Sequence, residues 1–145
     1  MDSSIPVRGF RLAINCFDAL LPQRQTSGSA GYDFFCRCDL TLPPRHTVKY
    51  RTGISAFMPH DEVLKIYIRS SVASNDIILR NSVAIIDSDF HDEIILLLYN
   101  DSDSTRIIKQ GDRIAQGIFQ KFLTTGDLVD SVRRGGIGST NLDRQ

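Results

Sequence analysis

The chain has no excess of charge, because 17 Lys and Arg residues balance 17 Asp and Glu residues over 145 positions. This balance argues against a nucleic-acid-binding protein, which depends on basic surface charge and counterion release. No apolar run approaches the ~18 residues of a membrane-spanning helix. The first ten residues lack the basic and apolar regions of a secretory signal peptide. We therefore expect a cytoplasmic protein, inside the host cell if its origin is viral or phage, without nucleic acid or membrane as a partner.

Cysteine is scarce, with three examples at Cys16, Cys36 and Cys38. An odd number of cysteines favours a reducing compartment over a disulfide framework. The spacing of Cys36 and Cys38 is too short for the usual zinc-binding pair, and the three histidines are scattered along the chain. We interpret Cys36 and Cys38 as two side chains on one face of a strand rather than as half of a metal site.

Segments rich in β-branched and apolar residues recur about every ten residues, and turn-forming residues separate them. Many short strands at this spacing predict an all-β fold, a jelly-roll-like β-sandwich or barrel. A chain of 145 residues fits one such domain. We expect at most one short helix, near Ser71–Asn75. The predicted strands are Phe10–Ile14, Thr47–Arg51, Gly53–Met58, Val63–Ile68, Asp76–Leu79, Ser82–Ile86, Glu93–Tyr99, Ile107–Ile108 and Arg113–Phe122.

Glu93–Tyr99 is apolar without alternation, which predicts a strand buried on both faces. The turn-forming segment Ser88–His91 precedes it and predicts a β-hairpin with Ser82–Ile86.

The C-terminal segment Arg133–Asn141, RRGGIGSTN, contains too little apolar surface to pack a core. Its glycine amides, hydroxyls and guanidinium groups suit a phosphate chain, although simple disorder explains the same composition. We therefore expect a β domain over residues 1–131 and a flexible, glycine-rich segment over residues 132–145 that closes over a ligand.

Five of these segments, taken in order, resemble the motifs of the trimeric deoxyuridine triphosphate nucleotidohydrolases (dUTPases). The resemblance implies a homotrimer with three sites shared between subunits. It also implies hydrolysis of dUTP to dUMP and pyrophosphate, with Mg²⁺ bound to the triphosphate, which keeps uracil out of DNA and supplies dUMP for dTMP synthesis. The matching segments are Ala30–Cys36, Ile68–Ala73, Asn81–Phe90, Gly111–Gln116 and Arg133–Thr140.

The same resemblance implies a role for individual residues. Asp87 is the expected general base, which activates the water that attacks the α-phosphorus. Asp33 is expected on the metal side, acting through water or a neighbouring arginine. The expected substrate-binding residues are Arg69, Ser70, Ser71, Asn81, Phe90, Gln116, Arg133, Ile137, Gly138, Ser139 and Thr140.

Several of these assignments have alternatives. Asp87 and its neighbours suit the cap of a hairpin turn, and Ser70–Ser71 suits a helix N-cap. Either Arg133 or Arg134 suits the γ-phosphate, and we favour Arg133. Asp112–Arg113 is interpreted as a pair of structural or interface charges.

The chain also departs from the family pattern. Ala84 and Asp92 stand where glycines are usual, Ile137 replaces an aromatic residue, and Asn141 replaces the final glycine. A dCTP deaminase is excluded because Leu97 stands where that enzyme needs a catalytic glutamate. A dUTPase-derived binding or signalling protein with weak or no activity is the remaining alternative.

Overall fold

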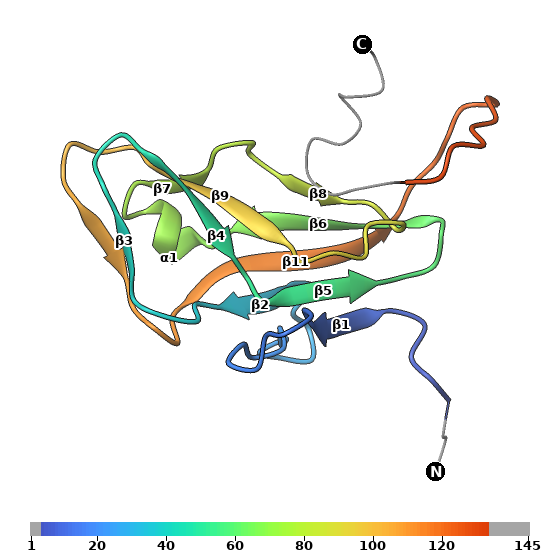
Figure 1. Ribbon diagram of the computed structural model, residues 1–145, viewed down its shortest axis with the longest axis horizontal. Helices are drawn as coiled ribbons and strands as arrows, with labels where there is room; N and C mark the ends of the chain where they lie inside the picture. The colour runs from blue at the N-terminus through green and yellow to red at the C-terminus, as the bar shows by residue number, and fades with distance from the viewer. Residues whose placement is uncertain (1–3, 134–145) are drawn as a thin grey trace.

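The structure is a computed structural model that describes residues 4–133. This part of the chain forms eleven strands and one short helix, α1 (Ser70–Ala73), as Figure 1 shows. The strands are β1 (Gly9–Leu12), β2 (Tyr32–Phe35), β3 (Leu40–Leu42), β4 (Thr47–Arg51), β5 (Ile54–Phe57), β6 (Glu62–Ile68), β7 (Ile77–Leu79), β8 (Ala84–Ile86), β9 (Ile95–Asn100), β10 (Arg106–Ile108) and β11 (Arg113–Lys121).

The strands form antiparallel sheets that enclose one apolar core. A four-stranded sheet has the order β2-β11-β6-β8, and a three-stranded sheet has the order β4-β9-β7. Two smaller pairs, β1-β5 and β10-β3, complete the fold. Inward side chains from both larger sheets are fully buried, including Phe34, Leu64 and Ile66 from the first and Leu96 and Leu98 from the second. The predicted all-β sandwich with one short helix is confirmed.

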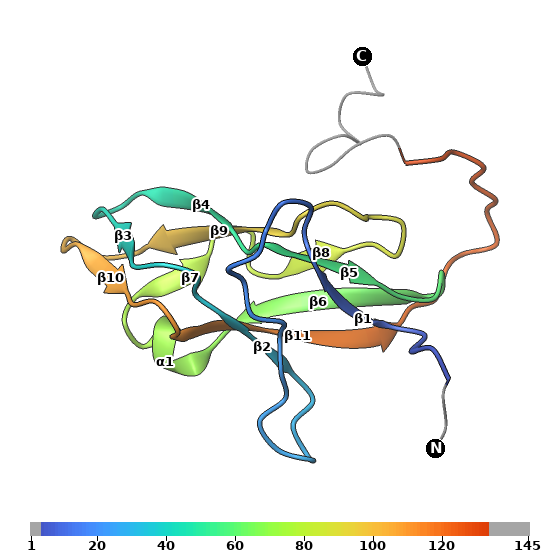
Figure 2. The same cartoon turned by 60° about the horizontal axis from the view of Figure 1, so that its bottom comes forward.

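Figure 1 and Figure 2 show which segments share an end of the molecule. The loop between β8 and β9 lies at the same end as the turn between β5 and β6 and the start of the C-terminal segment. Helix α1 lies at the opposite end in both views. Strand β6 runs between these two ends.

The predicted hairpin between β8 and β9 is wrong. Strand β8 pairs with β6, whereas β9 pairs with β4 and β7 in the other sheet. The chain crosses between the sheets at Ile94, whose N–H donates to the Ile54 carbonyl at the start of β5 at 2.8 Å and whose carbonyl accepts from the N–H of Thr52 in the β4–β5 turn at 3.1 Å. The expected burial of both faces of β9 is also only half right. Leu96 and Leu98 are fully buried, while Ile95 and Leu97 on the other face are partly exposed.

The interpretation of the two cysteines is wrong as well. Strand β2 ends at Phe35, so Cys36 and Cys38 lie beyond it in an irregular segment. Cys36 is buried, Cys38 is exposed, and the Cys36 thiol lies 3.1 Å from the Cys38 carbonyl. Burial raises the pKa of the Cys36 thiol, which disfavours the thiolate form needed by a nucleophile or metal ligand.

A buried amide closes the β9–β10 turn. The Asn100 side chain is fully buried, and its Nδ2 donates to the carbonyls of Leu42 at 2.9 Å and Ser104 at 2.7 Å. Its Oδ1 accepts from the Ser102 hydroxyl at 2.7 Å. These bonds satisfy the buried polar atoms, which stabilises the turn.

Within residues 4–133, we find no helix with the length and apolar character needed to cross a membrane.

Candidate functional site

Asp87 lies at the end of β8, at the start of a loop that we call the acidic loop (residues 87–92). The backbone N–H of Phe90 donates to the Asp87 carbonyl at 3.0 Å and closes a turn. The Ser88 hydroxyl donates to the His60 carbonyl at 3.1 Å and fixes this turn to the β5–β6 connection. Phe90 is buried in the core, while the Asp87 side chain is 54% exposed. The acidic loop is therefore anchored to the fold and exposes the Asp87 carboxylate to solvent.

The C-terminal segment returns to the acidic loop through Arg133. The Arg133 guanidinium forms an ion pair with Asp87, and its Nε lies 2.8 Å from Asp89 Oδ1. It also lies over the Phe90 ring, 5.9 Å from the ring centroid. The hydrogen bond to Asp89, more than the charge of Asp87, raises the pKa of Arg133 above its usual value. The Asp87 carboxylate thus pairs with an arginine from another segment, while the Asp87 carbonyl closes the turn that follows.

A second cluster surrounds Asp33 on β2. This buried carboxylate lies 3.5 Å from Arg69 Nε and 3.6 Å from Arg113 Nη1. Arg69 Nη1 also donates to the Arg113 carbonyl at 3.3 Å. The arrangement holds both guanidinium groups side by side, with donors left over for an anion. Arg113 was not among the predicted site residues, and it contacts Asp33 rather than Asp112.

Gln116 on β11 lies opposite Asp33 in the β2–β11 pairing. A Cβ atom at position 31 would come within 2.7 Å of the Gln116 side-chain oxygen, so Gly31 makes room for this side chain. The glycine and acid that the sequence places together in Ala30–Cys36 therefore have separate tasks. Gly31 accommodates Gln116, and Asp33 holds the arginines.

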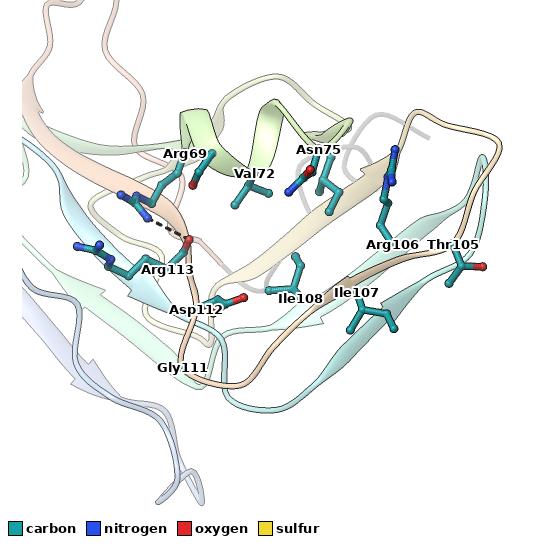
Figure 3. Close-up of a pocket in the computed structure, with 12 residues that line it drawn as sticks. Arg69, Val72, Asn75, Thr105, Arg106, Ile107, Ile108, Gly111, Asp112 and Arg113 are labelled. Carbon is teal, nitrogen blue, oxygen red and sulfur yellow. Dashed lines mark hydrogen bonds between the residues drawn. The ribbon is translucent and has the colours of Figure 1, made fainter.

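Arg69 and Arg113 lie at one end of an open pocket of about 770 Å³, as Figure 3 shows. Ser71 lines the same pocket, and Ser70 begins α1 beside it. The N-cap position of α1 is Arg69, without a side-chain capping bond, so the interpretation of Ser70–Ser71 as an N-cap is wrong. The arginines and serines of this segment are therefore available at the mouth of a cavity.

Within one chain the two clusters are far apart. Ile86 pairs with Leu64 of β6, so Asp87 lies near the first residues of that strand. Arg69 follows the last residue of β6. The separation of about six residues corresponds to roughly 20 Å at ~3.3 Å per residue. The sequence predicted most members of both clusters, but not Asp89 or Arg113, and a single chain does not bring Asp87 to Arg69.

The remaining predicted residues have different outcomes. Asn81 lies in an exposed turn at the opposite end of β8 from Asp87. Ile137, Gly138, Ser139 and Thr140 lie outside the described residues. The expected boundary between residues 131 and 132, and the flexibility of residues 132–145, stay predictions.

The Asp33 cluster leads to a stability prediction. Asp33→Ala leaves two partly buried arginines without their shared carboxylate, so we expect the free energy of unfolding to fall by about 1–3 kcal/mol. Asp61→Asn removes an exposed pair with Lys121 at 3.9 Å and is the control, with an expected change within about 0.5 kcal/mol. Urea denaturation followed by circular dichroism measures both. Equal effects of the two substitutions would contradict a structural role for Asp33.

Comparisons with known proteins show the family to which the chain belongs. The family model described as dUTPase matches residues 18–142. The deoxyuridine 5'-triphosphate nucleotidohydrolase of Desulfitobacterium hafniense is 37% identical over 132 residues, which cover 84% of this chain and 87% of that protein. The enzyme of the same name from Lactococcus lactis is 34% identical over 146 residues, which cover 92% and 97%.

Solved structures show the same fold. The crystal structure of the dUTPase from Streptococcus mutans superposes with a TM-score of 0.78 at 33% identity, over 82% of this chain and 99% of that one. A mutant of the Staphylococcus bacteriophage 80alpha dUTPase, solved with dUpNHpp, superposes with a TM-score of 0.74 at 20% identity, over 90% of this chain and 92% of that one. With its motifs in order and its fold and sequence matched over most of its length, this chain belongs to the dUTPase family.

Proposed function

We propose that this protein is a dUTP diphosphatase that hydrolyses dUTP to dUMP and pyrophosphate at sites shared between subunits of a homotrimer. The observation that carries the proposal is an exposed Asp87 on an anchored loop, in a chain that belongs to the dUTPase family. The product dUMP would serve the synthesis of dTMP, and the removal of dUTP would keep uracil out of DNA inside the cell.

The reaction requires a base for water and stabilisation of the departing pyrophosphate. The Asp87 carboxylate takes a proton as the water oxygen forms a bond to the α-phosphorus. The bond between the α-phosphorus and the bridging oxygen breaks, and negative charge moves onto pyrophosphate. The groups suited to stabilise that charge are the side chains of Arg69, Ser70, Ser71 and Gln116. Hydrogen bonds from guanidinium, hydroxyl and amide donors strengthen as the negative charge on pyrophosphate develops. Asp33 holds Arg69 in place for this task.

Mg²⁺ fits the site as an ion carried by the triphosphate. Among residues 4–133, no group of three or more His, Cys, Asp or Glu side chains is placed to hold a metal. Asp33 is already paired with Arg69 and Arg113, so a contact through water suits it better than direct ligation. Mg²⁺ commonly keeps several waters and takes phosphate oxygens as ligands. When bound, the ion neutralises charge on the phosphate groups.

Arg133 and Phe90 are proposed to meet the nucleotide on the acidic loop. The Arg133 guanidinium pairs with Asp87 and Asp89 and covers the Phe90 ring. A triphosphate offers this guanidinium a stronger, multiply charged partner. Transfer of Arg133 to the γ-phosphate would free Asp87 for the water and uncover the Phe90 ring for the deoxyribose, where it leaves no room for a 2′-hydroxyl.

The distance between the two clusters supports a shared site. Asp87 and Arg69 lie at opposite ends of β6, and in the proposed site a second subunit supplies one of them to the other. Closed cyclic symmetry then repeats the same composite site around the assembly. Light scattering is expected to give about three times 16.3 kDa, and an active monomer would contradict the shared site.

The departures at Ala84 and Asp92 do not favour the alternative of a binding or signalling protein. Ala84 is buried inside β8 and pairs with Ile66, so its methyl group packs in the core. The φ of Asp92 is not positive, so the backbone conformation at this position does not require glycine. The structure therefore accommodates both substitutions without distortion of the acidic loop.

Pyrophosphate release from dUTP in the presence of Mg²⁺ tests the proposed function. Release from dUTP should exceed release from dCTP, dTTP and UTP. A wrong base or sugar leaves hydrogen-bonding groups of the site unpaired or clashes with its side chains. Discrimination on the order of 10⁴-fold against a mismatched hydrogen-bonding edge is expected for such a site. Absence of dUTP hydrolysis would overturn the assignment.

Deletion of Arg133–Gln145 tests the contribution of the C-terminal segment. We expect turnover to fall by about 10²-fold, because the deletion removes Arg133 and the glycine and hydroxyl donors proposed for the phosphates. The last strand, β11, ends at Lys121, so the fold and the oligomer should survive. Steady-state kinetics, with circular dichroism and light scattering as controls, measure the effect. Full activity in the folded, truncated oligomer would show that the segment does not close the site.

A further inference from the structure

Glu93 follows the acidic loop directly and carries a nearly buried carboxylate, 12% exposed, that the proposed chemistry does not use. Its Oε2 accepts the backbone N–H of Gly53 at 2.7 Å, and its Oε1 accepts from Arg51 Nε at 2.9 Å. Arg37 Nη1 lies 3.7 Å from Oε2. The carboxylate therefore connects the end of the acidic loop to the β4–β5 turn and to two arginines.

The β4–β5 turn is a rigid anchor for this contact. Gly53 has a φ of +73°, and a Cβ atom at this position would come within 2.8 Å of the Ala19 Cβ. Both requirements restrict the position to glycine and leave its N–H directed at Glu93. Beside it, the N–H and hydroxyl of Thr52 both donate to the Ile94 carbonyl, at 3.1 and 2.7 Å.

The acidic loop is thus held at both ends. Its start is fixed by Ser88 on the His60 carbonyl and its end by Glu93 on the Gly53 N–H. Phe90, the proposed support for the sugar, lies between these two points, and Asp87, the proposed base, directly precedes Ser88. The four residues between these two fixed points have few alternative conformations, so the second anchor limits where Phe90 lies and holds the turn that follows Asp87.

We propose that Glu93 is a positioning residue, which acts on the reaction by holding the acidic loop, and with it Asp87 and Phe90, against the β4–β5 turn. This role rests on the proposed function, since it matters for catalysis only if the loop binds the nucleotide. Glu93 does not itself touch the reacting atoms. Its effect passes through the loop geometry alone.

The first test measures the loop without reference to activity. Hydrogen exchange of the Phe90 amide, which donates to the Asp87 carbonyl, should become about tenfold faster in Glu93→Ala, because the loop opens more often. Glu93→Gln keeps an oxygen that accepts the Gly53 N–H but loses the charge facing Arg51 and Arg37, so its exchange should be intermediate. Unchanged exchange in Glu93→Ala would overturn the anchor.

The second test measures the consequence for the reaction. For dUTP, kcat/KM should fall by about 10- to 100-fold in Glu93→Ala, with partial rescue in Glu93→Gln. Preference for dUTP over UTP should also fall, because a displaced Phe90 no longer excludes the 2′-hydroxyl. A purely structural role would lower the melting temperature but leave kcat/KM and this preference unchanged, and that result would overturn the proposal.

Ser102→Ala is the matched control. It removes buried hydrogen bonds from the β9–β10 turn, including the 2.7 Å contact to Asn100, and so lowers stability away from the acidic loop. We expect a lower melting temperature, unchanged exchange of the Phe90 amide and kcat/KM within about twofold of the parent protein. If Glu93→Ala does not fold, Glu93→Gln is tested alone, and slower turnover together with faster hydrogen exchange of the loop supports the role.

A parent protein that releases no pyrophosphate from dUTP overturns the proposed function instead.

Discussion

Replacement of Asp87 by Asn is expected to lower dUTP turnover by about 10²–10⁴-fold, the usual contribution of a general base. The amide has the same shape as the carboxylate but cannot accept the proton of the attacking water. Asp87 is half-exposed at the end of β8, so the substitution should leave the fold intact. Binding of a non-hydrolysable dUTP analogue should change far less than turnover.

Asp89→Asn provides the comparison for this result. Asp89 lies in the same loop and contacts the same guanidinium, with its Oδ1 2.8 Å from Arg133 Nε. If the loss of negative charge from the loop were responsible, turnover would fall alike in both variants. If the loss of the general base is responsible, turnover falls in Asp87→Asn alone. We expect the Asp89 variant to lose less than about tenfold in turnover, measured as pyrophosphate release. Unchanged turnover in Asp87→Asn would remove Asp87 as the base.

Two inactive variants are expected to restore activity when they assemble together. Asp87→Asn lacks the base, and Arg69→Ala lacks a phosphate-binding guanidinium at the opposite end of β6. If each site takes Asp87 from one subunit and Arg69 from another, random mixed trimers contain sites with both intact groups. About one quarter of the sites should then be complete, because each subunit is the correct one with a chance of one half.

The experiment refolds the two variants together from denaturant and compares them with the same proteins refolded apart and then mixed. Native mass spectrometry reports whether mixed trimers have formed. Activity near a quarter of the parent value in the first sample, and none in the second, is the expected result. Mixed trimers without activity would show that one chain supplies both Asp87 and Arg69.

Local sequence patterns determined much of the fold. The segment Thr47–Arg51, which contains Thr, Val and Tyr, predicts β4 with its observed bounds, and most other strands appear within a few residues of their prediction. The alternation of apolar and polar residues and the turn-forming residues span only a few positions, so they can be recognised without knowledge of the partner strand. Strands β2 and β3 escaped prediction, and β2 places an aspartate among aromatic residues. Their stability comes from pairing with β11 and β10.

The sequence by itself determined the fold class, the family and the residues expected to act on a triphosphate, because order and residue type along the chain are sufficient for these. Only the tertiary structure decided what each residue faces. It paired Asp33 with Arg113, placed Arg133 on Asp87, sent β9 into a different sheet from β8, and set Glu93 against Gly53. It also placed Asp87 and Arg69 at opposite ends of β6. These contacts join residues distant in sequence, and their geometry depends on sheet register and loop closure, which no local pattern encodes.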